Sequence, residues 1–200
     1  MMRDVTPIVQ NMLIINGLVF LIQLLFPDLT NEHLVLYKLN WLGLREFDTD
    51  SYFRGYQLVT YFFSHGGFMH ILFNMLALWS IGPQVEFVMG SKRFLLYYLF
   101  CGFVGGLFIT FLDPSVTPVL GSSVPGFGVL LAFALYFPNS HLSFFFIGMP
   151  AKWMMLILIA MSLFAMQYSP NSGISHFGHL AGVAAGFLFY FLESVKNRFF

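Results

Sequence analysis

Residues 65–89 read HGGFMHILFNMLALWSIGPQVEFVM, an apolar stretch with ionisable and amide side chains close to its start. The adjacent glycines predict a helix boundary, and the run that follows is long enough to cross a bilayer, which takes about 20 apolar residues. We therefore expect a membrane-spanning helix over residues 68–89, kinked at Pro83. His70 and Asn74 are four residues apart, so they share one face of that helix.

The composition of the whole chain agrees with a membrane protein. Of 200 residues, 58% are hydrophobic, 20% are aromatic and only 9% are charged, whereas a soluble domain is about 45–50% apolar and about 25% charged. Nine Lys and Arg balance nine Asp and Glu, and no basic block exists, which excludes a nucleic-acid-binding protein. The single cysteine excludes a disulfide framework and a cysteine-based metal site.

Five further apolar runs complete a predicted all-α bundle of six transmembrane helices. With the first stretch, the expected helices cover residues 8–26, 68–89, 94–112, 120–137, 153–168 and 177–192. The segment 28–57 mixes five of the nine acids with Leu, Tyr and Trp, which is typical of a loop at the membrane interface. One polytopic membrane domain over residues 1–200 is the resulting prediction.

The distribution of Lys and Arg predicts the orientation. With both termini in the cytoplasm, six basic residues fall in inside segments and three in outside segments, the latter all in the acid-rich first loop. The first helix lacks a cleavage-site pattern, so we interpret it as retained rather than as a signal peptide. Without a transit-peptide pattern, we expect the plasma membrane, and a bacterial one.

Polar side chains gather at the outer ends of the even-numbered helices. His70 and Asn74 begin the second helix, Ser123 the fourth and His179 the sixth, and all three helices run from outside to inside. Polar groups within a membrane are functional candidates by default. Acyl transfer uses this set: a serine nucleophile, a histidine base, and amide or imidazole donors for the oxyanion. No carboxylate is placed to orient His179, which indicates a Ser–His dyad.

Three motifs then carry a resemblance to a known family. His65-x4-His70-x3-Asn74, the Gly121-Ser122-Ser123 segment with Phe127, and His179-x2-Gly182-x3-Gly186 resemble the three motifs of the rhomboid intramembrane serine proteases, in their small bacterial six-helix form. The resemblance extends over essentially the whole chain.

The resemblance implies a role for each matched residue. Ser123 would be the nucleophile and His179 the general base, with Asn74, His70 and the Ser123 amide as oxyanion donors. Gly121 belongs to the nucleophile motif, and Phe127 would pack against the catalytic imidazole. His65 would be a neighbouring structural histidine. Gly182 and Gly186 would let the fourth and sixth helices approach closely. The expected activity is hydrolysis of peptide bonds in or beside transmembrane segments of membrane-protein substrates.

One residue departs from the family pattern. Family members usually carry glycine directly after the nucleophile, but Val124 stands there, followed by Pro125. A β-branched side chain crowds a turn that normally has none, so we expect Val124 to narrow the access of substrate. An inactive rhomboid-like protein that binds transmembrane helices is therefore the alternative hypothesis. A separate alternative for His70 and Asn74 is a structural role, in which they only hold helices together.

The remaining classes of site are disfavoured. A catalytic zinc site needs three protein ligands and usually a carboxylate base, and no His-Glu-x-x-His motif or acid lies at the depth of these histidines. A transporter would be expected to show repeat symmetry or broken helices at the midplane, and the sequence contains no convincing repeat. We expect no metal and no cofactor, with the bilayer and substrate transmembrane segments as partners. The physiological substrate and the oligomeric state stay open.

Overall fold

The fold was analysed in a computed structural model, which describes residues 5–37, 53–113, 117–144, 147–168 and 174–199. The long helices are α1 (Pro7–Leu25), α4 (Phe68–Met89), α5 (Ser91–Leu112), α6 (Ser123–Tyr136), α7 (Ala151–Tyr168) and α8 (His176–Phe199). The short elements are α2 (Pro27–His33), α3 (Gln57–Thr60), the 3-10 turn η1 (Tyr61–Phe63), β1 (His141–Phe144) and β2 (Ile147–Pro150).

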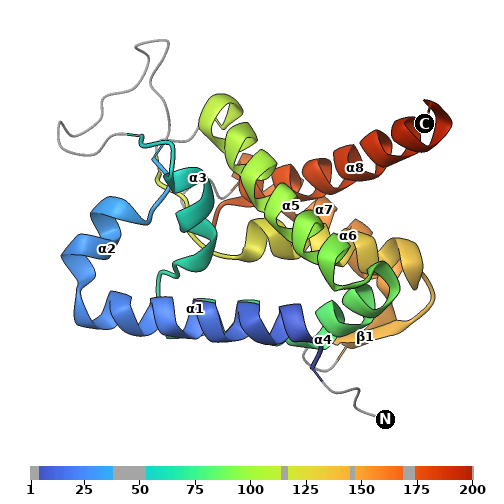
Figure 1. The fold of residues 1–200 in the computed structure, drawn as a ribbon, viewed down its shortest axis with the longest axis horizontal. Helices are drawn as coiled ribbons and strands as arrows, with labels where there is room; N and C mark the ends of the chain where they lie inside the picture. The colour runs from blue at the N-terminus through green and yellow to red at the C-terminus, as the bar shows by residue number, and fades with distance from the viewer. Residues whose placement is uncertain (1–4, 38–52, 114–116, 145–146, 169–173, 200) are drawn as a thin grey trace.

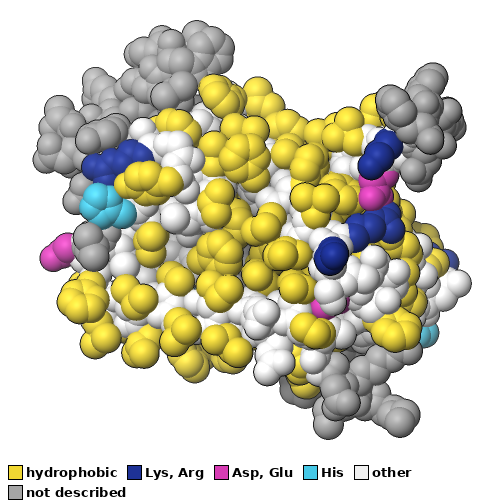
Figure 2. Space-filling model, in the orientation of Figure 1, with side chains coloured by type: hydrophobic (Ala, Val, Ile, Leu, Met, Phe, Trp, Pro, Cys, Tyr) yellow, Lys and Arg dark blue, Asp and Glu magenta, His cyan; other side chains and the backbone are white. Residues whose placement is uncertain are grey.

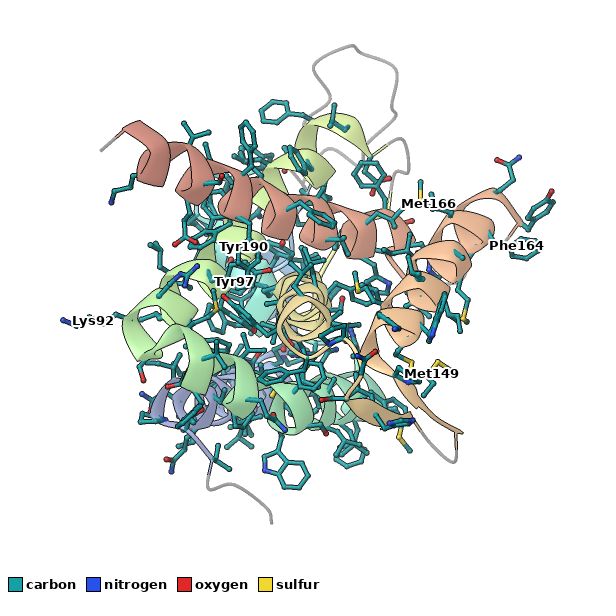
Figure 3. The ribbon with its side chains drawn as sticks, turned by 90° about the vertical axis from the view of Figure 1, so that its right-hand side faces the viewer. Lys92, Tyr97, Met149, Phe164, Met166 and Tyr190 are labelled. Atoms are coloured by element: carbon teal, nitrogen blue, oxygen red, sulfur yellow. The ribbon has the colours of Figure 1, made fainter. Side chains whose placement is uncertain are left out.

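The protein is a multi-pass helical membrane protein. Five of the long helices are long and apolar enough to cross a membrane, and α6, with 14 residues, is a shorter apolar helix. Figure 3 shows α6 end-on at the centre of the bundle, with α5, α7 and α8 around it. The α6 side chains Val129 and Ala132 have no exposed surface. A helix that is apolar on all sides is stable when neighbours surround it, which explains why this short helix is central.

The outer surface shows which direction crosses the bilayer. Apolar side chains cover the middle of the face in Figure 2, and charged side chains lie toward its left and right sides. In the same orientation, α1 begins and α8 ends on the right, and α2 and α3 lie on the left (Figure 1). The bilayer normal therefore runs horizontally in these views, and the two terminal helices have their free ends on one side.

The predicted helix bounds need several corrections. The helix predicted for 68–89 has those bounds in the structure and stays continuous through Pro83. The fourth helix begins at Ser123 rather than at residue 120. Gly121 has a φ of 115°, which lies outside the helical region, so the helix cannot extend back through this residue. The sixth helix extends to Phe199 rather than ending at residue 192, since Glu193, Lys196 and Arg198 favour helix and no Gly or Pro interrupts the segment beyond the apolar run.

Two connections contain structure that the sequence did not predict. The segment 138–150 includes an antiparallel hairpin in which His141 pairs with Pro150, where we expected only a connection. The interfacial segment 28–57 includes nearly all of the short helix α2 and ends at the first residue of α3. Residues 38–52 of that segment lie outside the described part of the chain.

A buried carboxylate ties three helices together at the end opposite α2 and α3. Glu86 on α4 is 2% exposed. It accepts hydrogen bonds from the backbone N–H groups of Ile8 (3.1 Å) and Val9 (2.9 Å) in the first turn of α1. The hydroxyls of Thr6 (2.5 Å) and Ser91 (2.6 Å) also donate to it. Glu86 thereby caps α1, whose first N–H groups have no partner within the helix, and joins it to α4 and the start of α5.

Candidate active site

Gly121 sets the approach to the first turn of α6. Its φ of 115° favours glycine, and its N–H donates to the Tyr61 carbonyl (2.9 Å). A Cβ at this position would lie 2.7 Å from Nε2 of His70. Backbone conformation and space therefore both require glycine here, and they bring the His70 imidazole directly against the chain two residues before Ser123.

The two serines at the start of α6 have different surroundings. Ser122 is 4% exposed, and its hydroxyl and amide lie 3.2 Å and 3.5 Å from Nε2 of His65. Ser123 is only half-buried. Of the pair, Ser123 is thus the more exposed serine, and Ser122 is held by a buried imidazole.

His65 connects this region to α1. Its backbone N–H donates to Oε1 of Gln23 (2.8 Å), a buried side chain in the last part of α1. Burial, reinforced by the neighbouring His70, lowers the pKa of His65 to about 4. A neutral His65 can accept hydrogen bonds at Nε2 from Ser122, which a doubly protonated ring cannot do. The arrangement fixes the backbone before Ser123.

His70 and Asn74 lie one turn apart on the same face of α4, as their spacing predicted. The N–H of Gly66 donates to Nδ1 of His70 (3.2 Å), so the neutral ring carries its proton on Nε2, the atom that faces Gly121. Nδ2 of Asn74 donates to the His70 carbonyl (2.8 Å) and has a second hydrogen to offer. Both side chains are half-buried. One imidazole N–H is thereby directed at Gly121, two residues before Ser123.

The His179 imidazole lies over the first turn of α6. It stacks on Phe127, with ring centroids 4.2 Å apart and an interplanar angle of 8°, and Phe127 is one helical turn after Ser123. The start of α8 is fixed by Ser175, whose hydroxyl accepts the Gly178 N–H (3.1 Å) as a helix cap does. His176 lies edge-on to His179, with centroids 5.8 Å apart. Among the described residues, no hydrogen bond joins the Ser123 hydroxyl to His179.

The glycines of α8 allow close contact with its neighbours. A Cβ at Gly182 would collide with the Val124 carbonyl oxygen, so α6 and α8 touch backbone to backbone one turn beyond His179. A Cβ at Gly186 would lie 2.6 Å from the Tyr97 hydroxyl and 2.9 Å from Cδ2 of Leu131. Gly182 thus serves the α6–α8 contact, and Gly186 serves contacts with both α5 and α6.

Comparison with known proteins places this arrangement in a family. The model of the Rhomboid domain matches residues 52–196, which include every residue of the site described above except Gln23. The chain belongs to the rhomboid family. The putative rhomboid protease YdcA of Bacillus subtilis is 32% identical over 145 residues, which are 72% of this chain and 69% of that protein.

Other rhomboid relatives are longer. Rhomboid protease GluP of Bacillus subtilis is 36% identical over 133 residues, covering 66% of this chain and 25% of that protein. Rhomboid protein 1, mitochondrial, of Saccharomyces cerevisiae is 31% identical over 144 residues, covering 68% of this chain and 42% of that protein. This rhomboid therefore spans less than half the length of both.

The position of Val124 in this rhomboid does not fit the expectation that its side chain narrows the access of substrate. Val124 is 1% exposed. Its Cγ1 lies where a Cβ on Gly105 of α5 would need room, and its Cγ2 lies against Gly178 of α8. The side chain is thus directed into the core, away from the open side of Ser123. The phase of a helix among its neighbours decides this direction, and the local sequence does not reveal it.

Two residues near the rhomboid site, Gln23 and Ser175, were not assigned a role from sequence. Gln23 and Ser175 hold the backbone beside His65 and His179, and His176 packs on His179. Gln23 is a polar residue in an otherwise apolar run, and Ser175 precedes an apolar helix at a capping distance, so both carried a signal. The described residues contain no group of three His, Cys, Asp or Glu side chains arranged to hold a metal ion.

Proposed function

We propose that this rhomboid-family protein is an intramembrane serine protease that cleaves peptide bonds in or next to transmembrane segments. Its relationship to named rhomboid proteases supports protease function. The observation that carries the proposal is the first turn of α6. There the more exposed serine, Ser123, lies between Gly121, which contacts His70, and Phe127, which stacks on His179.

The proposed reaction uses these groups in order. His179 takes the proton of the Ser123 hydroxyl as the oxygen attacks the scissile carbonyl carbon, and the carbonyl oxygen becomes an oxyanion. The Nε2–H of His70, the Asn74 amide and the Ser123 N–H donate to that oxyanion. His179 then gives the proton to the leaving amine, and the C–N bond breaks. Water, deprotonated by His179, attacks the acyl carbon, the C–O bond to Ser123 breaks, and His179 returns the proton to the Ser123 oxygen.

The alternative is a rhomboid-like protein that binds transmembrane helices without cutting them. The observation that favours it is the lack, among described residues, of a hydrogen bond between Ser123 and His179. Catalytic hydrogen bonds are often long without substrate and shorten in the reactive complex. The other argument for inactivity is that the Val124 side chain obstructs the site, and the burial of that side chain speaks against this argument.

The proposed setting is a bacterial plasma membrane, with both termini in the cytoplasm. The excess of Lys and Arg in the predicted inside segments supports this orientation. The free ends of α1 and α8 on one side of the molecule are consistent with it (Figure 1). The site then lies toward the outer leaflet, where α6 and α8 begin.

The test is cleavage of a transmembrane model substrate by the purified protein in proteoliposomes. We expect the wild-type chain to cut and Ser123→Ala to be inactive, since losing one member of a catalytic unit costs several orders of magnitude in kcat. Ser122→Ala is the matched control and should keep most activity. A folded wild-type protein that binds the substrate without cutting it would favour the alternative. Activity lost in the Ser122 variant alone would move the nucleophile by one residue.

A further inference from the structure

The side chain of Val124 occupies a socket made by glycines on two other helices. A Cβ on Gly105 of α5 would lie 2.5 Å from Val124 Cγ1, and a Cβ on Gly178 of α8 would lie 3.2 Å from Val124 Cγ2. The Val124 carbonyl touches Gly182 of α8. One residue of α6 therefore contacts α5 with its side chain, and α8 with both side chain and backbone.

The position of this socket relative to the site is its main property. Val124 directly follows Ser123, and Gly178 directly precedes His179. A contact between Val124 and Gly178 therefore connects the backbone of the nucleophile to the backbone of the base. In a helix, a valine side chain is almost confined to one χ1 rotamer, so the contact is a stiff one.

We propose that Val124 is a positioning residue, which fixes the separation of Ser123 and His179 by filling the socket of Gly105 and Gly178. This inference rests on the proposed function. A family member with glycine after the nucleophile has no such side chain, so helix spacing there must be set differently. In this chain the glycines at 105 and 178 leave the volume that the isopropyl group fills.

Removing or crowding the isopropyl group should shift the nucleophile relative to the base. A displacement of about 1 Å at such a site can cost about 100-fold in rate. Val124→Ala empties the socket, and Gly105→Ala overfills it. The other atoms around the Cβ position of Gly105 lie at 3.6 Å or more, which is ordinary contact. The clash of Gly105→Ala is therefore with Val124 alone, and the double variant Gly105→Ala/Val124→Ala should relieve it.

The experiment compares these three variants with the wild type and with Val129→Ala. Val129 is a fully buried valine further along the same helix, so it is the matched control for lost core packing. For each purified protein we would measure the melting temperature, kcat and KM for a transmembrane substrate, and the rate at which a small fluorophosphonate labels Ser123.

The proposal expects a specific pattern. Val124→Ala and Val129→Ala should lose similar thermal stability, but only Val124→Ala should lose about tenfold or more in kcat and in labelling rate, with KM little changed. Gly105→Ala should lose kcat as well, and the double variant should regain most of it. The double variant also keeps the test decisive if one single variant does not fold.

The contrary results are distinct. An active wild type in which Val124→Ala and Val129→Ala have equal kcat would overturn the positioning role and leave the proposed function intact. Additive losses in the double variant would do the same. A folded wild type that neither labels nor cleaves would overturn the proposed function, and the positioning role with it.

Discussion

Replacing Glu86 by alanine should destabilise the protein strongly and leave the kcat of the proposed cleavage nearly unchanged. Glu86 is buried and accepts four hydrogen bonds, from the N–H groups of Ile8 and Val9 and the hydroxyls of Thr6 and Ser91. Each buried donor left without a partner costs about 1–3 kcal/mol. Taking the lower end for all four, because water can enter near the membrane surface, gives a loss of about 4 kcal/mol.

The loss converts to a shift that thermal unfolding in detergent can resolve. For a chain of this size, 1 kcal/mol moves Tm by about 2–4 °C, so Glu86→Ala should melt roughly 8–16 °C below the wild type. Glu86→Gln keeps one acceptor oxygen but turns an amide N–H toward donors, and about half the effect is expected. At a temperature where both proteins are folded, kcat should differ by less than about threefold, because Glu86 lies at the opposite end of α4 from His70.

Glu193 provides the matched control. It forms an ion pair with Arg93 in which the side chains are 31% and 40% exposed, respectively. Such exposed pairs contribute about 0–1 kcal/mol, so Glu193→Gln should move Tm by no more than a few degrees. Equal shifts in the Glu86→Ala and Glu193→Gln proteins would refute the reasoning, as would a large loss of kcat in folded Glu86→Ala.

Three further predictions concern the site. Asn74→Ala should slow turnover toward the lower end of the range of about 10²–10³ for a lost oxyanion donor, because His70 remains; an unchanged rate in a steady-state cleavage assay would leave Asn74 a purely structural role. Gly182→Ala should lose activity and stability through collision with Val124, whereas Gly126→Ala, with no atom within 4 Å of its Cβ position, should be neutral or slightly stabilising in thermal unfolding. The lowered pKa of His65, about 4 against 6.5, means that the unfolded chain binds more protons between these values. The stabilisation is therefore complete above pH 6.5 and is lost as pH falls toward 4, by about 3 kcal/mol in all; if the Tm of His65→Gln falls as steeply with decreasing pH as that of the wild type, the pH dependence does not come from His65.

Much of the helical framework could be predicted from sequence, because it follows from local pattern. The bounds of α4 followed from paired glycines before a long apolar run, and the multi-pass all-α class followed from composition. The hairpin formed by β1 and β2 could not be predicted. Each strand has only four residues and forms only by pairing with the other, so no longer local pattern distinguishes it from a connection. The start of α6 also depended on a contact far along the chain, between Gly121 and His70.

The candidate site, like the helical framework, could be predicted from sequence only in part. The spacing of His70 and Asn74 and the resemblance of three motifs indicated which residues belong together. Spacing alone did not distinguish the buried Ser122 from the more exposed Ser123, and it did not reveal that the Val124 side chain is buried. Both depend on how α6 is rotated among α4, α5 and α8, which is decided by packing of glycines against larger side chains on other helices.

The most direct measurement is to label the folded protein with a fluorophosphonate, digest it, and locate the adduct by mass spectrometry of the peptides. Our account predicts one adduct, on Ser123 of the wild type, and none on Ser123→Ala or His179→Asn proteins that still melt cooperatively. Ser122→Ala should be labelled at Ser123 like the wild type. An adduct on Ser122, or no adduct on a folded wild-type protein that binds transmembrane substrates, would contradict the assignment of Ser123 and His179 as nucleophile and base.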